Sequence, residues 1–241
     1  MNVGTSTFAT THWSVVLAAR EPASPQAAAA LEELCRAYWY PLYAYVRRQG
    51  RSAHDAEDLL QSFFVRFLEK DFLHQVDRAK GRFRSFLLGA LNHFLANEWD
   101  KARSQKRGGQ AHFLSLDTGQ AERWYGEDLA SDLTPEKLYE QRWACVLLER
   151  VMQRLEHDSE SAGKGDSFAA LKGFLIGEDG GQSYPDLAAQ FGVTEAALKM
   201  RVQRLRHRYQ RLLREEIAQT VTSPEEVEDE IRHLFSILSS S

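Results

Sequence analysis

The chain has 241 residues, of which 43% are hydrophobic and 27% are charged, so it can bury one medium core or two small ones. Its 15 glycines and 6 prolines are few for this length, and apolar residues recur at spacings of three and four, which predicts an all-α fold. No apolar run approaches the roughly 18 residues of a membrane span, and no basic-then-apolar leader opens the chain, so we expect a cytoplasmic protein. Cys35 and Cys145 lie at helical spacing from apolar residues, which favours core packing over redox or metal roles.

An N-terminal extension over residues 1–30 precedes the first predicted helix. Apolar residues from Leu31 to Val46 recur at helical spacing. Pro41 lies within this stretch, and we expect it to kink or break the helix after Tyr40 because proline lacks the amide hydrogen of a helix interior.

Two further helices complete a first predicted domain over residues 31–109. Ser52 gives a capping signal, and an apolar stripe follows from Ala56 to Leu68. The third helix begins at Phe83 and continues towards Arg103 before two consecutive glycines at 108–109 end it.

Periodicity is lost over residues 110–134, which contain several acids among small and polar residues, so we expect a flexible acidic linker. Helix resumes at Pro135, a favourable first-turn residue, and a break at 159–167 precedes a short helix over 168–176. These elements predict two helical domains joined by the linker, with the second domain over 135–220.

Residues 183–209 carry the pattern of a helix-turn-helix. Ser183 caps a short helix, Gly192 permits a tight turn, and Thr194 caps a second helix whose Leu198 and Val202 face inward. Away from that apolar face, Lys, Gln and Arg side chains are long enough to reach base edges, and the surrounding arginines suit phosphates. The predicted DNA-binding residues are Thr194, Glu195, Lys199, Met200, Arg201, Gln203, Arg204, Arg206 and Arg208.

Charge is segregated along the chain although its net value is only −4. Residues 78–107 hold eight Lys or Arg against two acids, and residues 199–214 hold seven Lys or Arg and no acid. Such clusters are typical of phosphate-binding surfaces. Residues 215–230 then hold seven acids and no Lys or Arg.

The tail over residues 221–241 is predicted to form an acidic amphipathic helix, because Val227, Ile231, Leu234 and Leu238 follow helical spacing. Two interpretations stay open. The helix either completes a domain by packing, or it is an autoinhibitory or partner-binding element whose acids shield the basic recognition helix.

Four strings of this sequence together resemble the sigma-70 family of RNA polymerase sigma factors, in particular the short extracytoplasmic-function class (ECF, group 4). They are Asp55-Ala-Glu-Asp-Leu-Leu-Gln61, Gly81-Arg-Phe-Arg-Ser-Phe-Leu87, Ser183-Tyr-Pro-Asp-Leu-Ala-Ala189 and Leu198-Lys-Met-Arg-Val-Gln-Arg-Leu205. The resemblance covers roughly Leu31 to Gly109, as region 2, and Glu140 to Glu216, as region 4.

The resemblance implies bacterial transcription initiation with core RNA polymerase and promoter DNA as partners. Region 2 would bind the clamp coiled coil of the largest subunit, and region 4 would read the minus-thirty-five element while docking on the flap. The implied polymerase-binding residues are Asp55, Glu57, Asp58, Gln61 and Ser62. The implied residues for recognition and melting of the minus-ten element are Lys80, Arg82, Arg84, Asn92, His93, Asn97, Lys101 and Arg103.

Three positions depart from the family pattern. His93 stands where an Asn is usual, Asn97 where an Asp is common, and Ser62 where an acid often follows the Gln. The linker is expected to run through the active-site and RNA-exit channels. Restraint by an anti-sigma protein, by the tail, or by a kinase acting on Thr10 or Thr11 stays open.

Two other classes of protein explain parts of the sequence less well. A stand-alone helix-turn-helix regulator with an N-terminal sensor or dimerisation domain explains the second half of the chain but not the acidic edge at 55–61. A nucleic-acid enzyme is disfavoured because the eight histidines are scattered and no metal-binding or Ser/His/Asp pattern occurs. We therefore expect no catalytic residues, metal or cofactor.

Overall fold

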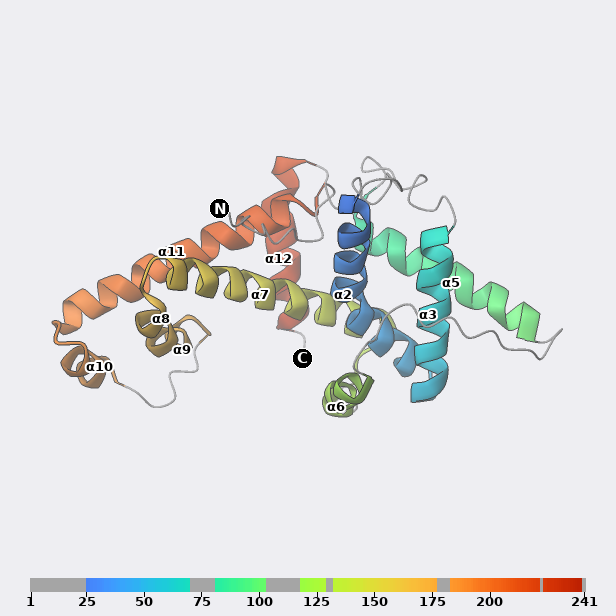
Figure 1. Cartoon of the computed structure of the whole chain (residues 1–241), viewed down its shortest axis with the longest axis horizontal. Helices are drawn as coiled ribbons and strands as arrows, with labels where there is room; N and C mark the ends of the chain where they lie inside the picture. The colour runs from blue at the N-terminus through green and yellow to red at the C-terminus, as the bar shows by residue number, and fades with distance from the viewer. Residues whose placement is uncertain are drawn as a thin grey trace. The chain divides into compact units, whose positions relative to one another are not determined.

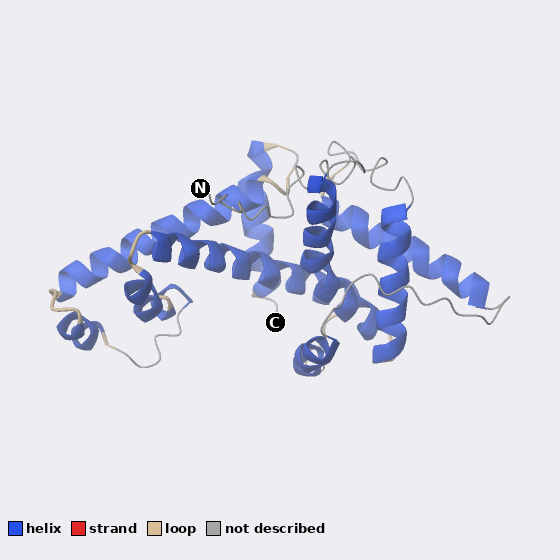
Figure 2. Ribbon diagram, viewed as in Figure 1, coloured by secondary structure: helices blue, strands red, loops and turns tan. Residues whose placement is uncertain are grey.

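The structure is a computed structural model, and it describes residues 25–69, 81–102, 118–128, 132–176, 183–221 and 223–239. Within these ranges the regular elements are all helical, as Figure 2 shows, which confirms the predicted all-α class. None of the helices in the described ranges is long and apolar enough to cross a membrane. Thr10 and Thr11, together with most of the N-terminal extension, lie outside the described residues.

The helices follow one another along the chain as labelled in Figure 1. They are α2 (Pro25–Arg48), α3 (Ala53–Glu69), α5 (Phe83–Ala102), α6 (Thr118–Asp128), α7 (Pro135–Ser161), α8 (Gly165–Leu171), α9 (Gly173–Ile176), α10 (Tyr184–Gln190), α11 (Glu195–Ala218), the 3-10 turn η2 (Pro224–Glu226) and α12 (Val227–Leu238).

The chain divides into two compact units. Unit 1 comprises residues 1–146 and 217–241, and unit 2 comprises residues 147–216. This division differs from the predicted domain limits, because α6, the start of α7 and the C-terminal helix α12 all belong to unit 1. The predicted boundaries followed breaks in local periodicity, whereas the units are defined by contacts between segments far apart in the sequence.

Helices α2, α3 and α5 form the centre of unit 1, with α3 packed against both of the others. Phe63 contacts Phe64, Phe67 and Phe94, with ring centroids 5.5 to 5.7 Å apart, so aromatic packing joins α3 to α5. Pro41 lies inside α2, and the helix does not end at Tyr40.

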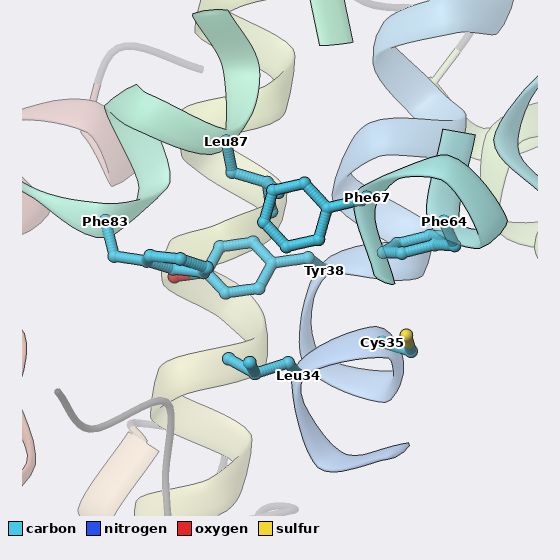
Figure 3. Close-up of a pocket in the computed structure, with 7 residues that line it drawn as sticks. All are labelled: Leu34, Cys35, Tyr38, Phe64, Phe67, Phe83 and Leu87. Carbon is cyan, nitrogen blue, oxygen red and sulfur yellow. The ribbon is translucent and has the colours of Figure 1, made fainter. Parts of the chain in front are cut away.

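A small apolar gap lies where these three helices meet, lined by Leu34, Cys35, Tyr38, Phe64, Phe67, Phe83 and Leu87. Figure 3 shows the rings of Tyr38 and Phe83 side by side and Leu87 turned towards Phe67. The gap has a volume of only about 10 Å³ and offers almost no polar surface, so it is a packing space and not a ligand site. Cys35 is buried as predicted, and burial together with nearby Glu32 raises the pKa of its thiol to about 12.

Helix α6 forms within the range that was predicted to be an irregular linker, and it packs on α2 and α3. Ala121, Tyr125 and Asp128 are buried at helical spacing on one side of α6. Glu122 accepts hydrogen bonds from Tyr43 and from Arg47 Nε, the latter at 2.8 Å. Contacts with α2 therefore stabilise a helix whose own sequence is a weak helix signal.

Unit 2 has its own core, built from α8, α9, α10 and α11. The buried residues are Leu171, Phe174, Leu187, Ala188, Leu198 and Val202. The small Ala188 lets α10 approach α11, and Leu198 and Val202 fix α11 through one apolar side. The predicted inward positions of the helix-turn-helix are thus buried together.

Candidate nucleic-acid interface

Helix α5 carries three of the predicted minus-ten residues on its exposed side. Asn92, His93 and Asn97 are all exposed. Asn97 Nδ2 lies 3.0 Å from His93 Nδ1, and the Tyr45 hydroxyl donates a hydrogen bond of 2.8 Å to Asn92 Oδ1. These side chains form a polar row of amides and an imidazole that suits hydrogen bonding to bases or phosphates.

Arg84, which the family resemblance implies as a minus-ten residue, does not face solvent. Its side chain is 1% exposed, and its Cζ lies 4.1 Å from the ring centroid of Trp143. Arg84 Nη1 pairs with Glu230 of α12, and Nε lies 3.3 Å from Glu140 Oε1 of α7. Contacts from two distant helices cover a position that helical periodicity alone places on the surface.

Arg82 immediately precedes α5 and shares the same partner. Its Nη2 lies 2.7 Å from Glu230 Oε2, and its side chain is 34% exposed. Burial alone would lower the pKa of Arg84, but the carboxylates of Glu230 and Glu140 outweigh that cost and raise it. One carboxylate, that of Glu230, therefore contacts both arginines.

Three predicted minus-ten residues lie beyond what the structure describes. Lys80 and Arg103 lie outside the described residues, and the side chain of Lys101 is likewise not described. Their role in DNA binding stays a prediction.

Helix α3 presents the predicted polymerase-binding edge. Ser52 caps it by accepting a hydrogen bond of 3.1 Å from the Asp55 amide, as its sequence predicts. Asp55, Asp58 and Ser62 are exposed, and Gln61 Nε2 donates to Glu57 Oε1 at 3.3 Å. All five residues thus lie on α3 as a row of acids, an amide and a hydroxyl, whereas the opposite side carries the buried phenyl rings.

The helix-turn-helix forms as its residues predict. The Asp186 amide donates to Ser183 Oγ at 3.3 Å, and the Ala197 amide donates to Thr194 Oγ1 at 3.2 Å, so both helices are capped by side chains. Gly192 between them has a φ of +61°, a conformation that glycine adopts without strain.

The outer side of α11 is long, polar and exposed. Met200 is 54% exposed, and Arg201, Gln203 and Arg204 are exposed as well. Lys199 Nζ lies 2.6 Å from Glu195 Oε1, one turn earlier, and this carboxylate raises the pKa of the lysine. This row has the dimensions and chemistry of a recognition helix for a DNA major groove.

Two predicted phosphate-binding residues of α11 also hold unit 2 together. Arg206 Nη2 donates to the Phe174 carbonyl at 2.9 Å, and Arg208 Nη2 lies 3.0 Å from Asp158 Oδ2 of α7. Phosphate contact by these two arginines stays a prediction. A bound phosphate would have to share the arginines with the Phe174 carbonyl and Asp158, or displace these partners.

Sequence reasoning missed two residues that contact Arg84, namely Glu230 and Glu140. A signal was present for Glu230, because it occupies the apolar side of α12 together with Leu234 and a lone acid there requires a cation. Within the described residues no cluster of three or more His, Cys, Asp or Glu is arranged to hold a metal.

Comparison with known families identifies the domain that contains α3 and α5. Residues 34–105 match the family Sigma-70 region 2, a range that contains α3, α5 and most of α2. No curated protein and no solved structure matches the chain. The matched range does not include the helix-turn-helix of unit 2. The assignment of that motif depends on its helix caps and its turn geometry alone.

Sigma-70 region 2 is a domain of non-catalytic transcription-initiation factors, and its match supports a role of this chain in promoter recognition by RNA polymerase. More particularly, the match over residues 34–105 supports a factor of the sigma-70 family.

Proposed function

We propose that this chain is an extracytoplasmic-function sigma factor in which unit 1 binds core polymerase and the minus-ten element and unit 2 reads the minus-thirty-five element. The observation that carries the proposal is the position of the matched domain. Residues 34–105 include both the acidic edge of α3 and the polar row of α5, so one domain offers a polymerase-facing and a DNA-facing surface.

The α3 edge supports polymerase binding through its charge. Exposed carboxylates at Asp55 and Asp58, next to Gln61, complement a basic coiled coil of the polymerase clamp, and complementary charge speeds and orients docking. Ser62 in place of a fourth acid leaves the row of Asp55, Glu57 and Asp58 shorter by one charge.

Unit 2 supports duplex reading independently of unit 1. In α11, Lys199, Gln203 and Arg204 provide side chains that pair with base edges, and a good bidentate pair discriminates by about 1–3 kcal/mol. The flap of the polymerase is the proposed partner of the same unit.

The alternative, a stand-alone regulator, differs in one property that is simple to measure. A regulator has no use for core polymerase, so capture of purified core enzyme by the tagged chain tests the proposal. We expect capture by the wild type and a loss of at least tenfold in the double variant Asp58→Ala/Gln61→Ala. Glu149→Ala, which removes an exposed acid from α7, is the matched control and should leave capture unchanged. Capture that survives the double variant at full strength, or no capture by the wild type, would contradict the proposal.

A further inference from the structure

The C-terminal helix α12 places a buried carboxylate on the arginines at the start of α5. Glu230 is 0% exposed. Its Oε1 pairs with Arg84 Nη1, and its Oε2 lies 2.7 Å from Arg82 Nη2 as an ion pair without hydrogen-bond geometry. Beside it, His233 Nε2 of α12 lies 2.8 Å from Glu140 Oε2, and Glu140 also contacts Arg84. Helices α5, α7 and α12 therefore meet in a cluster of charges whose centre, Arg84 and Glu230, is buried.

Helix α12 is attached to the rest of unit 1 through a buried charge, which is unusual for a packing helix. Helix α12 buries a carboxylate while Phe235 of the same helix stays 54% exposed, which reverses the usual distribution of charged and aromatic side chains. Within the described residues, Arg84 Nη2 is buried without a hydrogen-bond partner. A buried ion pair contributes little to stability compared with well-packed apolar residues, so packing alone gives no reason for this arrangement.

The two arginines held by Glu230 are a pair suited to a phosphate. Guanidinium groups donate to carboxylate and phosphate oxygens in the same way, so the carboxylate of Glu230 occupies the place that a phosphodiester oxygen pair would take. Arg82 and Arg84 also lie on the domain that the proposed function assigns to promoter DNA.

We infer that α12 is an internal inhibitor of nucleic-acid binding by unit 1, in which Glu230 occupies a phosphate site formed by Arg82 and Arg84. The site opens when α12 leaves, and the arginines then bind the sugar-phosphate backbone. This inference rests on the proposed function, because it assigns the covered surface to DNA. It places the tail's inhibitory contact on α5 and not on the recognition helix α11.

The test compares two substitutions in the full chain that change the net charge equally. Glu230→Gln removes the buried charge, and Glu228→Gln removes an exposed charge from the same helix. The probe is a fluorescein-labelled single-stranded DNA 25-mer of random sequence, and the measurement is its Kd by anisotropy from 0.05 to 0.3 M NaCl. Each additional ion pair with a phosphate raises the affinity about fivefold at 0.1 M salt and steepens the salt dependence by about 0.7.

We expect Glu230→Gln to bind about fivefold more tightly than the wild type with a steeper salt dependence, and Glu228→Gln to change Kd less than twofold. Adding Arg82→Ala to Glu230→Gln should reverse part of this increase in affinity, because it removes one member of the site. Equal affinities of the Glu230→Gln and Glu228→Gln variants would overturn the inference, and so would a failure of every variant to bind the oligonucleotide.

A second measurement keeps the inference testable if Glu230→Gln folds poorly. Hydrogen exchange of the wild-type chain should show faster exchange of the amides of residues 230–238 when the oligonucleotide saturates the protein. Unchanged exchange in α12 with DNA bound would overturn the inference. Promoter-dependent transcription by the wild type with core polymerase separates the sigma-factor proposal from the inhibitor proposal. If transcription occurs while the DNA-binding and hydrogen-exchange tests of α12 both fail, only the inhibitor role is refuted.

Discussion

The change Leu198→Ala should destabilise unit 2 while unit 1 stays folded. Leu198 is fully buried in the core of the helix-turn-helix. Removing three buried carbons at about 0.8 kcal/mol each costs about 2.4 kcal/mol, and the cavity raises the loss in free energy of unfolding to about 2.7–5 kcal/mol. A unit of about 70 residues has a stability of about 4–10 kcal/mol, so this loss is a large part of the total.

The positions of the tryptophans make this change measurable one unit at a time. All five, Trp13, Trp39, Trp99, Trp124 and Trp143, lie outside residues 147–216. In urea, tryptophan fluorescence therefore follows unit 1, whereas far-ultraviolet circular dichroism follows the helices of both units. For Leu198→Ala we expect helix loss at lower urea with an unchanged fluorescence transition.

The matched control is Met200→Ala, which truncates an exposed neighbour on α11 and should change stability by less than about 0.5 kcal/mol. A loss below about 1 kcal/mol for Leu198→Ala would refute the assignment of this residue to the core of unit 2. A fluorescence transition that moves together with the dichroism would refute the division into two units.

Three further predictions follow from single sites. Gly192→Ala forces a side chain into a positive φ and should cost about 1–2 kcal/mol in the urea unfolding of unit 2 followed by dichroism; no loss would contradict the turn geometry. Burial alone would raise the pKa of Glu122, but hydrogen bonds from α2 outweigh burial and lower the pKa. The ionised Glu122 therefore stabilises the docking of α6 fully above the ordinary Glu pKa of about 4.3. This stabilisation is lost as the pH falls through the lower pKa of the folded state. The fluorescence of Trp124 on α6 should report that loss, and an identical acid titration for Glu122→Gln would count against it. The thiol of Cys35 has a pKa of about 12 and should react with Ellman's reagent at pH 8 far more slowly than the thiol of the less buried Cys145. Equal reaction rates of the two thiols would show that the contact between α2 and α3 opens readily.

The helix-turn-helix could be predicted closely because its determinants are local. Ser183 and Thr194 each cap a helix through an amide three residues later, and Gly192 sits at the positive-φ turn between them. Each of these interactions spans a few residues, so the order of residue types along the chain specifies the geometry directly.

Features that depend on distant partners could not be predicted in the same way. Arg84 is buried by Glu230, 146 residues later, and α6 depends on Glu122 reaching Arg47, 75 residues earlier. Helical periodicity assigns a side of a helix but does not say which other segment covers it. The sequence could therefore place the predicted residues of α3 and α11 on exposed helix sides, whereas the burial of Arg84 at the start of α5 required the structure.

Transcription in vitro with purified core polymerase and a genomic promoter library tests the central claim most directly. The account predicts transcripts that begin at a common set of promoters only when this chain is added, and that are lost in the Asp58→Ala/Gln61→Ala variant. No promoter-dependent transcript, from a core enzyme that is active with another sigma factor, would contradict it.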